Sequence, residues 1–325
     1  MIDAKSQEIV NAEKRMFSGV KFSDPALTAK GEARAAVELR ALETLWVNTG
    51  TLCNIECSHC YIESSPTNDA LSYFTRAELR PFLDEIEQAA LGTREIGFTG
   101  GEPFMNPDIV PMLEDCLVRG FDVLVLTNAM APMMRPRVQA GLLDLGQRFG
   151  GRLTLRVSLD HYTAPLHDAE RGAGSFAASC AGLDWLVRHG FRIHIAGRTL
   201  YGEDEQAARA GFAALYERLG LKTDPWSNHE TVLFPEMDEH ADVPEITTEC
   251  WSILNVDPAA MMCATSRMLV KRKGDTAPAV LPCTLLPFDG RFDSGRTLKE
   301  AAGAVALNHP HCAKFCVLGG GSCSA

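Results

Sequence analysis

The sequence lacks the long apolar run that a membrane-spanning helix needs. No stretch approaches the about 20 consecutive apolar residues of such a helix. The first residues, MIDAKSQEIVNAEKRMF, are charged throughout and hold no apolar core of a secretory signal. Positive charge is also scarce, since 31 Lys and Arg stand against 42 Asp and Glu and leave a net charge of −11. We therefore expect a cytoplasmic protein whose main partner is neither a nucleic acid nor a membrane.

Internal repeats, low-complexity tracts and a linker that could separate two freely moving domains are also missing. The 325 residues, 46% hydrophobic and 22% charged, suit a globular protein with one large domain, or one large and one small. The eleven cysteines are the anomaly, with three at 53–60, two isolated and six after residue 249. Because the cytosol keeps thiols reduced, this number favours metal or redox chemistry over disulfides.

A regular alternation of strands and helices is predicted for the middle of the chain. Short runs rich in β-branched residues predict strands at 44–49, 95–100, 122–127, 153–160, 191–197 and 231–235. Helical patterns span 75–91, 107–119, 135–149, 175–189 and 204–219, with a capping box at Thr75 and helix-ending glycines at 120 and 190. Such alternation predicts an α/β fold with a parallel sheet that curls into a barrel or partial barrel. Two further helices are expected near the start of the chain, at 5–19 and 28–43, and a short hairpin near 268–283.

Three cysteines stand within eight residues directly after the first predicted strand, as Cys53-x3-Cys57-x2-Cys60. The carboxyl ends of parallel strands are where ligands gather in such folds. A tetrahedral zinc site or a fully ligated iron–sulfur cluster uses four protein ligands. Either a fourth ligand, such as His59 or a cysteine of the C-terminal region, comes from elsewhere, or one coordination position is open.

This arrangement resembles the cluster motif of the radical SAM superfamily, in which three thiolates hold three irons of a [4Fe–4S] cluster. The resemblance implies that Cys53, Cys57 and Cys60 hold this cluster at the catalytic centre. It also implies that the fourth iron is open and binds the amino and carboxylate groups of S-adenosylmethionine (SAM). His59 stands before the third cysteine, where the family usually has an aromatic residue, and is expected to contact the cofactor.

Two further motifs fall at strand ends in the order that the family has, so that the resemblance covers roughly residues 44–235. FTGGEPFMNP follows the second strand, and LRVSLD ends the fourth. Glycines admit a close backbone approach and an acid suits a cation, so the glycines and the acid of GGEP are assigned to the methionyl ammonium of SAM. The cofactor contacts carried over are Gly100, Gly101, Glu102, Thr127, Asn128, Ser158, Asp160, Arg171 and Arg198. The alternative is that Ser158 and Asp160 only cap the following loop.

The C-terminal region resembles the SPASM or twitch extensions of the same superfamily, which hold auxiliary iron–sulfur clusters. The expected metal ligands are Cys263, Cys283, Cys312, Cys316 and Cys323, with Cys250 as a further candidate. Four thiolates complete one [4Fe–4S] cluster, so one auxiliary cluster is expected, and the spacing leaves open which cysteines hold it. Zinc is the alternative metal. Cys116 and Cys180 lie in predicted amphipathic helices and are expected to be core residues.

The expected organisation is an N-terminal helical extension (1–43), a partial (β/α)6 barrel (44–240) and a small cysteine-rich cap (241–325). The resemblance implies that SAM is cleaved reductively to a 5′-deoxyadenosyl radical, which takes a hydrogen atom from the substrate. An electron donor such as flavodoxin or ferredoxin is implied with it. His194, His161-Tyr162 and the loop at 226–230 are further candidates for substrate contact, with a core role as the alternative for His194.

Radical SAM enzymes that modify ribosomal peptides often carry a leader-recognition domain of the winged-helix type before the barrel. Only about 43 residues precede the first predicted strand here, too few for a domain of that kind. The first expectation is therefore a small-molecule biosynthetic substrate that undergoes an oxidation or related C–H modification. Modification of a peptide or protein side chain is the second. A non-catalytic iron–sulfur or zinc scaffold is the alternative of another class, and a hydrolytic metalloenzyme fits less well because no His-Glu-x-x-His pattern occurs.

Overall fold

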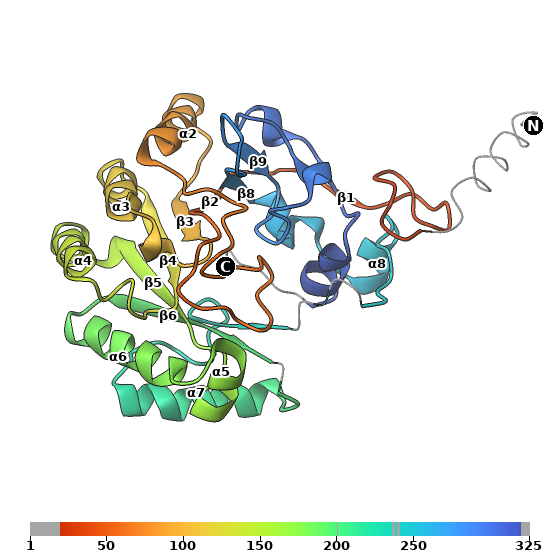
Figure 1. The fold of residues 1–325 in the computed structure, drawn as a ribbon. Helices are drawn as coiled ribbons and strands as arrows, with labels where there is room; N and C mark the ends of the chain where they lie inside the picture. The colour runs from red at the N-terminus through yellow and green to blue at the C-terminus, as the bar shows by residue number, and fades with distance from the viewer. Residues whose placement is uncertain (1–19, 200, 236–237, 239–240, 320–325) are drawn as a thin grey trace, which may run out of the picture. The chain divides into compact units, whose positions relative to one another are not determined.

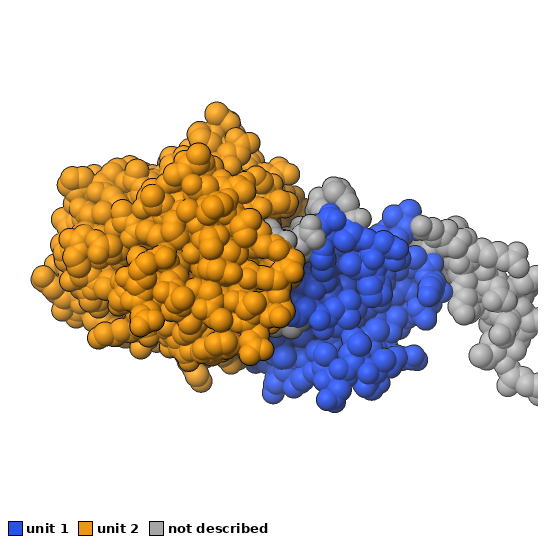
Figure 2. Space-filling view, turned by 90° about the horizontal axis from the view of Figure 1, so that it is seen from below, with its two compact units in different colours: residues 1–40, 237–265, 303–323 blue, residues 41–236, 266–302, 324–325 orange. Residues whose placement is uncertain are grey.

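The computed structural model describes residues 20–199, 201–235, 238 and 241–319. The chain divides into two compact units, coloured separately in Figure 2. Unit 1 comprises residues 1–40, 237–265 and 303–323, and unit 2 comprises 41–236, 266–302 and 324–325. This division differs from the expected one, because the segment 266–302 joins the barrel and the N-terminal segment joins the C-terminal one. No helix in the described ranges is long and apolar enough to cross a membrane.

Unit 2 is built on one mainly parallel sheet, with strand order β7-β6-β5-β4-β3-β2-β8-β9. The strands are β2 (Thr44–Asn48), β3 (Glu95–Thr99), β4 (Asp122–Thr127), β5 (Leu153–Ser158), β6 (Arg192–Arg198), β7 (Thr231–Phe234), β8 (Ser266–Val270) and β9 (Ala279–Leu281). Strands β2 to β7 pair in parallel in chain order, and β8 continues the sheet parallel to β2. The antiparallel β8–β9 pair confirms the expected hairpin. All six predicted barrel strands are present, which confirms the α/β partial barrel.

Helices pack against one face of this sheet (Figure 1). They are α2 (Arg76–Ala89), α3 (Ile109–Val118), α4 (Pro136–Phe149), α6 (Ser175–Arg188) and α7 (Glu205–Leu219), while the short α5 (Ala164–Arg171) packs against α6. The alternate strand residues that point toward them are apolar and fully buried, as Leu45, Ile96 and Val125 are. The five predicted helices are therefore confirmed, because each strand presents an apolar face that only an amphipathic helix can cover. Short 3-10 turns span Pro103–Met105, Gly150–Arg152, Gly290–Phe292 and Glu300–Ala302.

The helix ends follow the predicted chemistry. Thr75 and Glu78 form the reciprocal capping box of α2. Gly120 and Gly190 follow α3 and α6 with φ of 94° and 72°, values that favour glycine. The short helix α5 was not predicted, because eight residues with a proline near the start carry too little periodicity.

Unit 1 joins segments from both parts of the chain. Its elements are β1 (Ala36–Val37), α8 (Cys250–Leu254), 3-10 turns at Pro258–Ala260 and Met262–Ala264, β10 (Val305–Ala306) and a π-helix at Cys312–Val317. Strands β1 and β10 pair antiparallel. The helix expected at 28–43 is wrong. Arg34 lies fully buried in extended chain, donates to the Leu307 carbonyl and forms a 2.5 Å ion pair with Glu245. These tertiary contacts outweigh the helical pattern, and the other N-terminal helix lies outside the described residues.

Candidate active site

The loop that carries the three cysteines leaves the carboxyl end of β2 and is held against the end of β3. Thr49 N and Oγ1 both donate to the Thr99 carbonyl, at 2.8 and 2.9 Å. One step further, Gly101 N donates to the Gly50 carbonyl at 2.8 Å. Glu102 N donates to the Leu52 carbonyl at 3.1 Å. The GGEP segment therefore continues the pairing of the two strands and fixes the backbone that leads into Cys53.

The two glycines of GGEP are required by this close approach. A Cβ atom on Gly101 would lie 2.3 Å from the Leu52 carbonyl oxygen, and one on Gly100 would lie 2.6 Å from the Gly50 carbonyl oxygen. Gly100 also has a φ of 141°, which L side chains rarely adopt. Both contacts are with backbone, so a side chain at either position would displace the cysteine loop.

Glu102 is directed into the protein and is almost completely buried. Its carboxylate accepts hydrogen bonds from Phe104 N at 3.1 Å, Thr127 Oγ1 at 2.9 Å and Asn128 N at 2.8 Å. Burial raises its pKa to about 7, against the lowering effect of these donors. In this structure the carboxylate joins the ends of β3 and β4, and it does not line the cavity beside the cysteines.

Asp160 lies just beyond the end of β5 and holds two arginines. Its carboxylate accepts two hydrogen bonds from Arg171, 2.7 Å from Nε and 2.9 Å from Nη2. Arg198 Nε lies 3.4 Å away on the same carboxylate. Burial alone would raise the pKa of Asp160, but the two guanidinium groups hold it below its usual value. Asp160 itself does not line the cavity, whereas both arginines do. Its contribution is to orient them.

Arg198 is incompletely satisfied. Its Nη2 donates to the His59 carbonyl at 2.7 Å, whereas its buried Nη1 has no hydrogen-bond partner in the structure. A buried guanidinium N–H that lacks an acceptor and faces a cavity suits a carboxylate ligand.

The cysteine loop also rests on the end of α5. Ser58 N donates to the Glu170 carbonyl at 2.9 Å, and the His59 ring nitrogen Nδ1 lies 2.6 Å from the Glu170 carboxylate. The His59 side chain is half exposed and does not line the cavity. Glu170 is a residue that sequence reasoning missed, because the short α5 carries no motif that points to it.

A cavity of about 100 Å³ lies between these elements. Its wall includes all three thiols together with Gly100, Gly101, Thr127, Asn128, Ser158, Arg171 and Arg198. The structure thus brings ten of the predicted residues together, and it places His59, Glu102 and Asp160 behind or beside the wall. Ile55, Tyr61, Ile62, Ser64, Thr99 and Leu126 complete the wall and were not predicted.

The donor set of the cavity, three thiols from one loop, fits an iron–sulfur cluster. Burial raises the pKa of Cys53 to about 12, and Glu102, Cys57 and Cys60 add to the effect. Burial also raises the pKa of Cys57, against the influence of Arg171. No three His, Cys, Asp or Glu side chains within the described residues are arranged to hold one metal ion. In a [4Fe–4S] cluster each thiolate binds a separate iron, so three thiols that line one cavity suit such a cluster.

Unit 1 gathers four more thiols around its own hydrophobic core. Cys263 is buried there, and Cys250, Cys312 and Cys316 pack against the same core. Burial and the nearby Cys263 raise the pKa of Cys312 to about 12. No disulfide bond joins any two of the described cysteines. Cys283 belongs to unit 2, and Cys323 lies outside the described residues.

The sequence analysis overlooked a histidine pair in the same unit. His309 and His311 form a His-x-His pattern just before Cys312, and their ring centroids are 4.7 Å apart. Both histidines are buried.

The two remaining cysteines were expected to be core residues. Cys116 is fully buried in α3, whereas Cys180 is half-buried in α6.

The fold and the site together define a partial-barrel enzyme with three converging thiols at the carboxyl ends of its parallel strands. The chain belongs to the radical SAM superfamily, whose family model matches residues 47–210, about half of the chain. The cofactors of this superfamily are a [4Fe–4S] cluster with an open iron and SAM, and the thiols of the cavity are those that the motif assigns to the cluster.

Comparisons with individual proteins agree with this membership. The chain is 33% identical over 145 residues to the antilisterial bacteriocin subtilosin biosynthesis protein AlbA of Bacillus subtilis, which is 44% of this chain and 30% of AlbA. It is 29% identical over 202 residues to mycofactocin maturase MftC of Mycobacterium tuberculosis, which is 59% of this chain and 48% of MftC. The matched segments thus span less than half the length of these curated relatives.

Among solved structures, the chain resembles Streptococcus suis SuiB bound to S-adenosylmethionine. The TM-score is 0.57 at 11% identity, and the match covers 79% of this chain and 63% of SuiB. At this identity the likeness shows the fold alone, and it agrees with the partial barrel described above.

Proposed function

We propose that this chain is a radical SAM enzyme that modifies a peptide or protein side chain, with a small biosynthetic molecule as the second candidate substrate. The observation that carries the radical chemistry is the cavity in which three thiols face two arginines fixed by Asp160. The peptide substrate is supported by the relatives, since AlbA is named for the biosynthesis of a bacteriocin and MftC is named a maturase. This reverses the order of the two substrates that the sequence alone favours.

The residues of the cavity have separate parts in this proposal. Cys53, Cys57 and Cys60 hold the cluster, and Arg171 and Arg198 bind the carboxylate of SAM through charge-assisted hydrogen bonds. When both cofactors are bound, one electron passed to SAM yields methionine and a 5′-deoxyadenosyl radical, which takes a hydrogen atom from the substrate.

Other residues position the binding groups. Thr127, Asn128 and Ser158 offer polar contacts at the ends of β4 and β5, where the ribose and the amino group of SAM are expected. Glu102 acts on the ammonium only if the GGEP segment moves, because its carboxylate is satisfied by three donors. Its first role in this proposal is to hold the ends of β3 and β4 together.

An auxiliary [4Fe–4S] cluster in unit 1 is part of the proposal. Cys250, Cys263, Cys312 and Cys316 surround one hydrophobic core and supply the four thiolates that such a cluster needs. This assignment adds Cys250 and leaves Cys283 and Cys323 as the competing ligands. A flavodoxin or ferredoxin is the proposed electron donor.

The first test counts iron and sulfide after anaerobic reconstitution, for the wild type and for a Cys53/Cys57/Cys60 to Ala triple variant. We expect the wild type to hold two clusters and the variant one. After addition of dithionite and SAM, only the wild type is expected to form 5′-deoxyadenosine. Cys116→Ala, which removes a buried thiol outside the cavity, is the matched control and should behave as the wild type. A triple variant that keeps all its iron, with a wild type that forms no deoxyadenosine, would favour the scaffold reading.

The substrate class is tested with a size-fractionated extract of the source cells. We expect the peptide-containing fraction to increase deoxyadenosine formation, and prior digestion of that fraction with proteinase K to abolish the increase. An increase that appears only in the low-molecular-mass fraction and survives digestion would return the small molecule to first place.

A further inference from the structure

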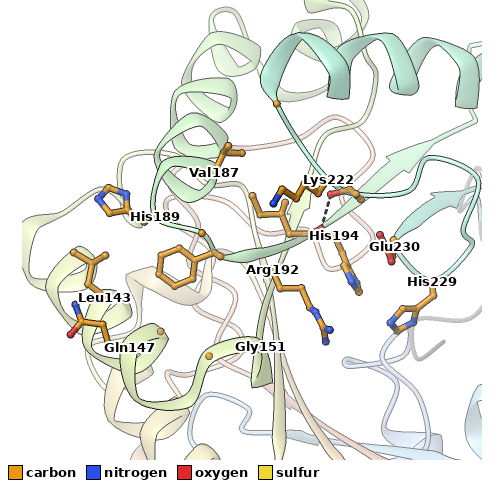
Figure 3. A pocket seen from close by; sticks show the side chains of 17 residues that line it. Leu143, Gln147, Gly151, Val187, His189, Arg192, His194, Lys222, His229 and Glu230 are labelled. Atoms are coloured by element: carbon orange, nitrogen blue, oxygen red, sulfur yellow. Dashed lines mark hydrogen bonds between the residues drawn. The ribbon is translucent and has the colours of Figure 1, made fainter.

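A second cavity, of about 770 Å³, opens at the opposite edge of the sheet in unit 2. It lies where β6 begins, between the carboxyl ends of α4, α6 and α7 (Figure 3). Arg198, in the wall of the cysteine cavity, ends the same strand that begins at Arg192. Four residues of a strand separate His194 from Arg198, which is about 13 Å at 3.3 Å per residue. A ligand in the second cavity is therefore distinct from one beside the cysteines.

Three basic side chains converge in this cavity. Figure 3 shows Arg192 and His194 extending to the same side of β6, toward His229 in the loop before β7. The ring centroids of His194 and His229 are 4.8 Å apart and nearly perpendicular. All three residues also line an adjoining cavity of about 280 Å³ at the amino ends of β3 to β6, whose wall includes the acids Glu43, Glu95 and Asp122. They form the wall that the two cavities share.

Two side chains of this wall, those of His194 and Arg192, are not paired with any of the acids among the described residues. His194 is 95% buried, and its Nδ1 has no hydrogen-bond partner in the structure. Arg192 forms no ion pair with any described residue, although Glu95 and Asp122 line the adjoining cavity with it. The charged neighbours that act on His194 are Arg156, His229 and Arg192, which are all basic, and burial together with them lowers its pKa to about 3. A neutral imidazole in basic surroundings can donate Nδ1–H to an anion without carrying charge itself.

Much of the rest of the cavity wall is apolar. Leu143, Val187 and Phe191 line one side, and Lys222 adds a second cation on another part of the wall. The one acid of this cavity, Glu230, is engaged by Asp224 N at 2.8 Å. Small-molecule sites combine such apolar walls with a few polar groups that fix the orientation of the ligand.

We infer that Arg192, His194 and His229 form a binding site for a small molecule that carries a carboxylate or phosphate group on an apolar body. The anionic group lies between the guanidinium and the two imidazoles, and the apolar body packs against Phe191 and its neighbours. This site is separate from the radical chemistry and does not depend on which substrate the enzyme modifies.

The site is tested by calorimetric titration of the reconstituted protein with phenyl phosphate and with benzoate. We expect at least one of the two to bind, and Arg192→Gln to weaken its binding at least tenfold. Arg137→Gln removes an exposed arginine of α4 outside the cavity and should leave the affinity unchanged. Binding of phenyl phosphate alone supports a phosphate ligand, and equal binding of benzoate shows that a carboxylate suffices.

Three results would overturn the inference: no binding of either anion, equal weakening by both substitutions, or equally tight binding of uncharged benzyl alcohol. A spectroscopic measurement covers the case in which Arg192→Gln alters the fold. Phenyl phosphate or benzoate, whichever binds, should shift the ring-nitrogen resonances of His194 and His229 in the wild type, while those of His167, a buried histidine of α5 outside the cavity, move less. Unchanged resonances for His194 and His229 would contradict the assignment.

Discussion

Replacing Asp160 by Asn tests whether the two arginines of the cavity depend on one buried carboxylate. Asp160 is 98% buried and accepts two hydrogen bonds from Arg171, with Arg198 Nε at 3.4 Å. The substitution leaves two guanidinium groups without their counter-charge. Losing one partner of a buried ion pair costs about 3–5 kcal/mol, so the free energy of unfolding should fall by about that amount.

The effect on SAM should be separable from the effect on stability. A charge-assisted hydrogen bond is worth about 1.5–3 kcal/mol, and at about 1.4 kcal/mol per factor of ten the loss of one such bond weakens binding about 10- to 100-fold. We would measure SAM binding by equilibrium dialysis of reconstituted protein under anaerobic conditions, at a temperature where the variant remains folded. Iron content should stay close to that of the wild type, because the hydrogen bonds of the Asp160 carboxylate come from Arg171 and not from a thiol.

Asp115→Asn is the matched control. Asp115 also joins two arginines, Arg76 at 2.5 Å and Arg80 at 2.9 Å, but it lies on α3 away from the cavity. This variant should bind SAM as the wild type does. If Asp160→Asn bound SAM within about twofold of the wild type at equal iron content, the arginines would not be held for SAM by this carboxylate.

The remaining predictions concern the loop, the buried acid and unit 1. Gly101→Ala forces a Cβ atom against backbone, so it should lower the free energy of unfolding by about 3 kcal/mol and reduce iron loading. Gly290→Ala, where nothing lies within 4 Å of the added Cβ, is the control and should do neither. Equal iron loading of the two variants would contradict the packing argument. Burial raises the pKa of Glu102 from 4.5 to about 7, so the folded protein holds the proton that the unfolded chain has lost, and stability falls as pH rises through this window. Glu102→Gln should remove that slope in urea unfolding between pH 5 and about 7, and an unchanged slope would assign it to another group. Cys250→Ala should lower the iron count by up to one cluster while Cys283→Ala does not, and the reverse result would exchange the two ligands.

The barrel could be predicted from the sequence because its strands and helices carry their own signals. Each strand from β2 to β7 alternates or runs apolar between turn residues, and each helix except α5 has an apolar stripe that matches the sheet. The failure at 28–43 has a tertiary cause. Arginine has a high helix propensity, but the guanidinium group of Arg34 is buried against Glu245 and the Leu307 carbonyl, which are far away in the sequence. No local pattern encodes those partners.

The sequence predicts which residues lie at the candidate site better than it predicts what each of them does there. A motif at the end of a strand shows that Asp160 and Glu102 lie near the cysteines, because parallel strands share one carboxyl edge. It does not show where a side chain points. Asp160 is turned toward two arginines and Glu102 toward three donors, and both arrangements depend on loops whose course the spacing does not contain.

The pairing of β1 with β10 sets an order of events during synthesis. Ala36 pairs with Ala306, so the N-terminal segment leaves the ribosome long before its partner strand exists. At about 5–20 residues per second, that delay is on the order of tens of seconds, ample time for β2 to β7 to collapse with their helices. A nascent chain stalled before residue 303 would therefore carry a nearly complete barrel, whereas unit 1 would still lack β10 and the segment that follows it. If the proposed ligands are right, Cys53, Cys57 and Cys60 are in place before unit 1 closes, so their cluster is expected to load iron before the auxiliary cluster.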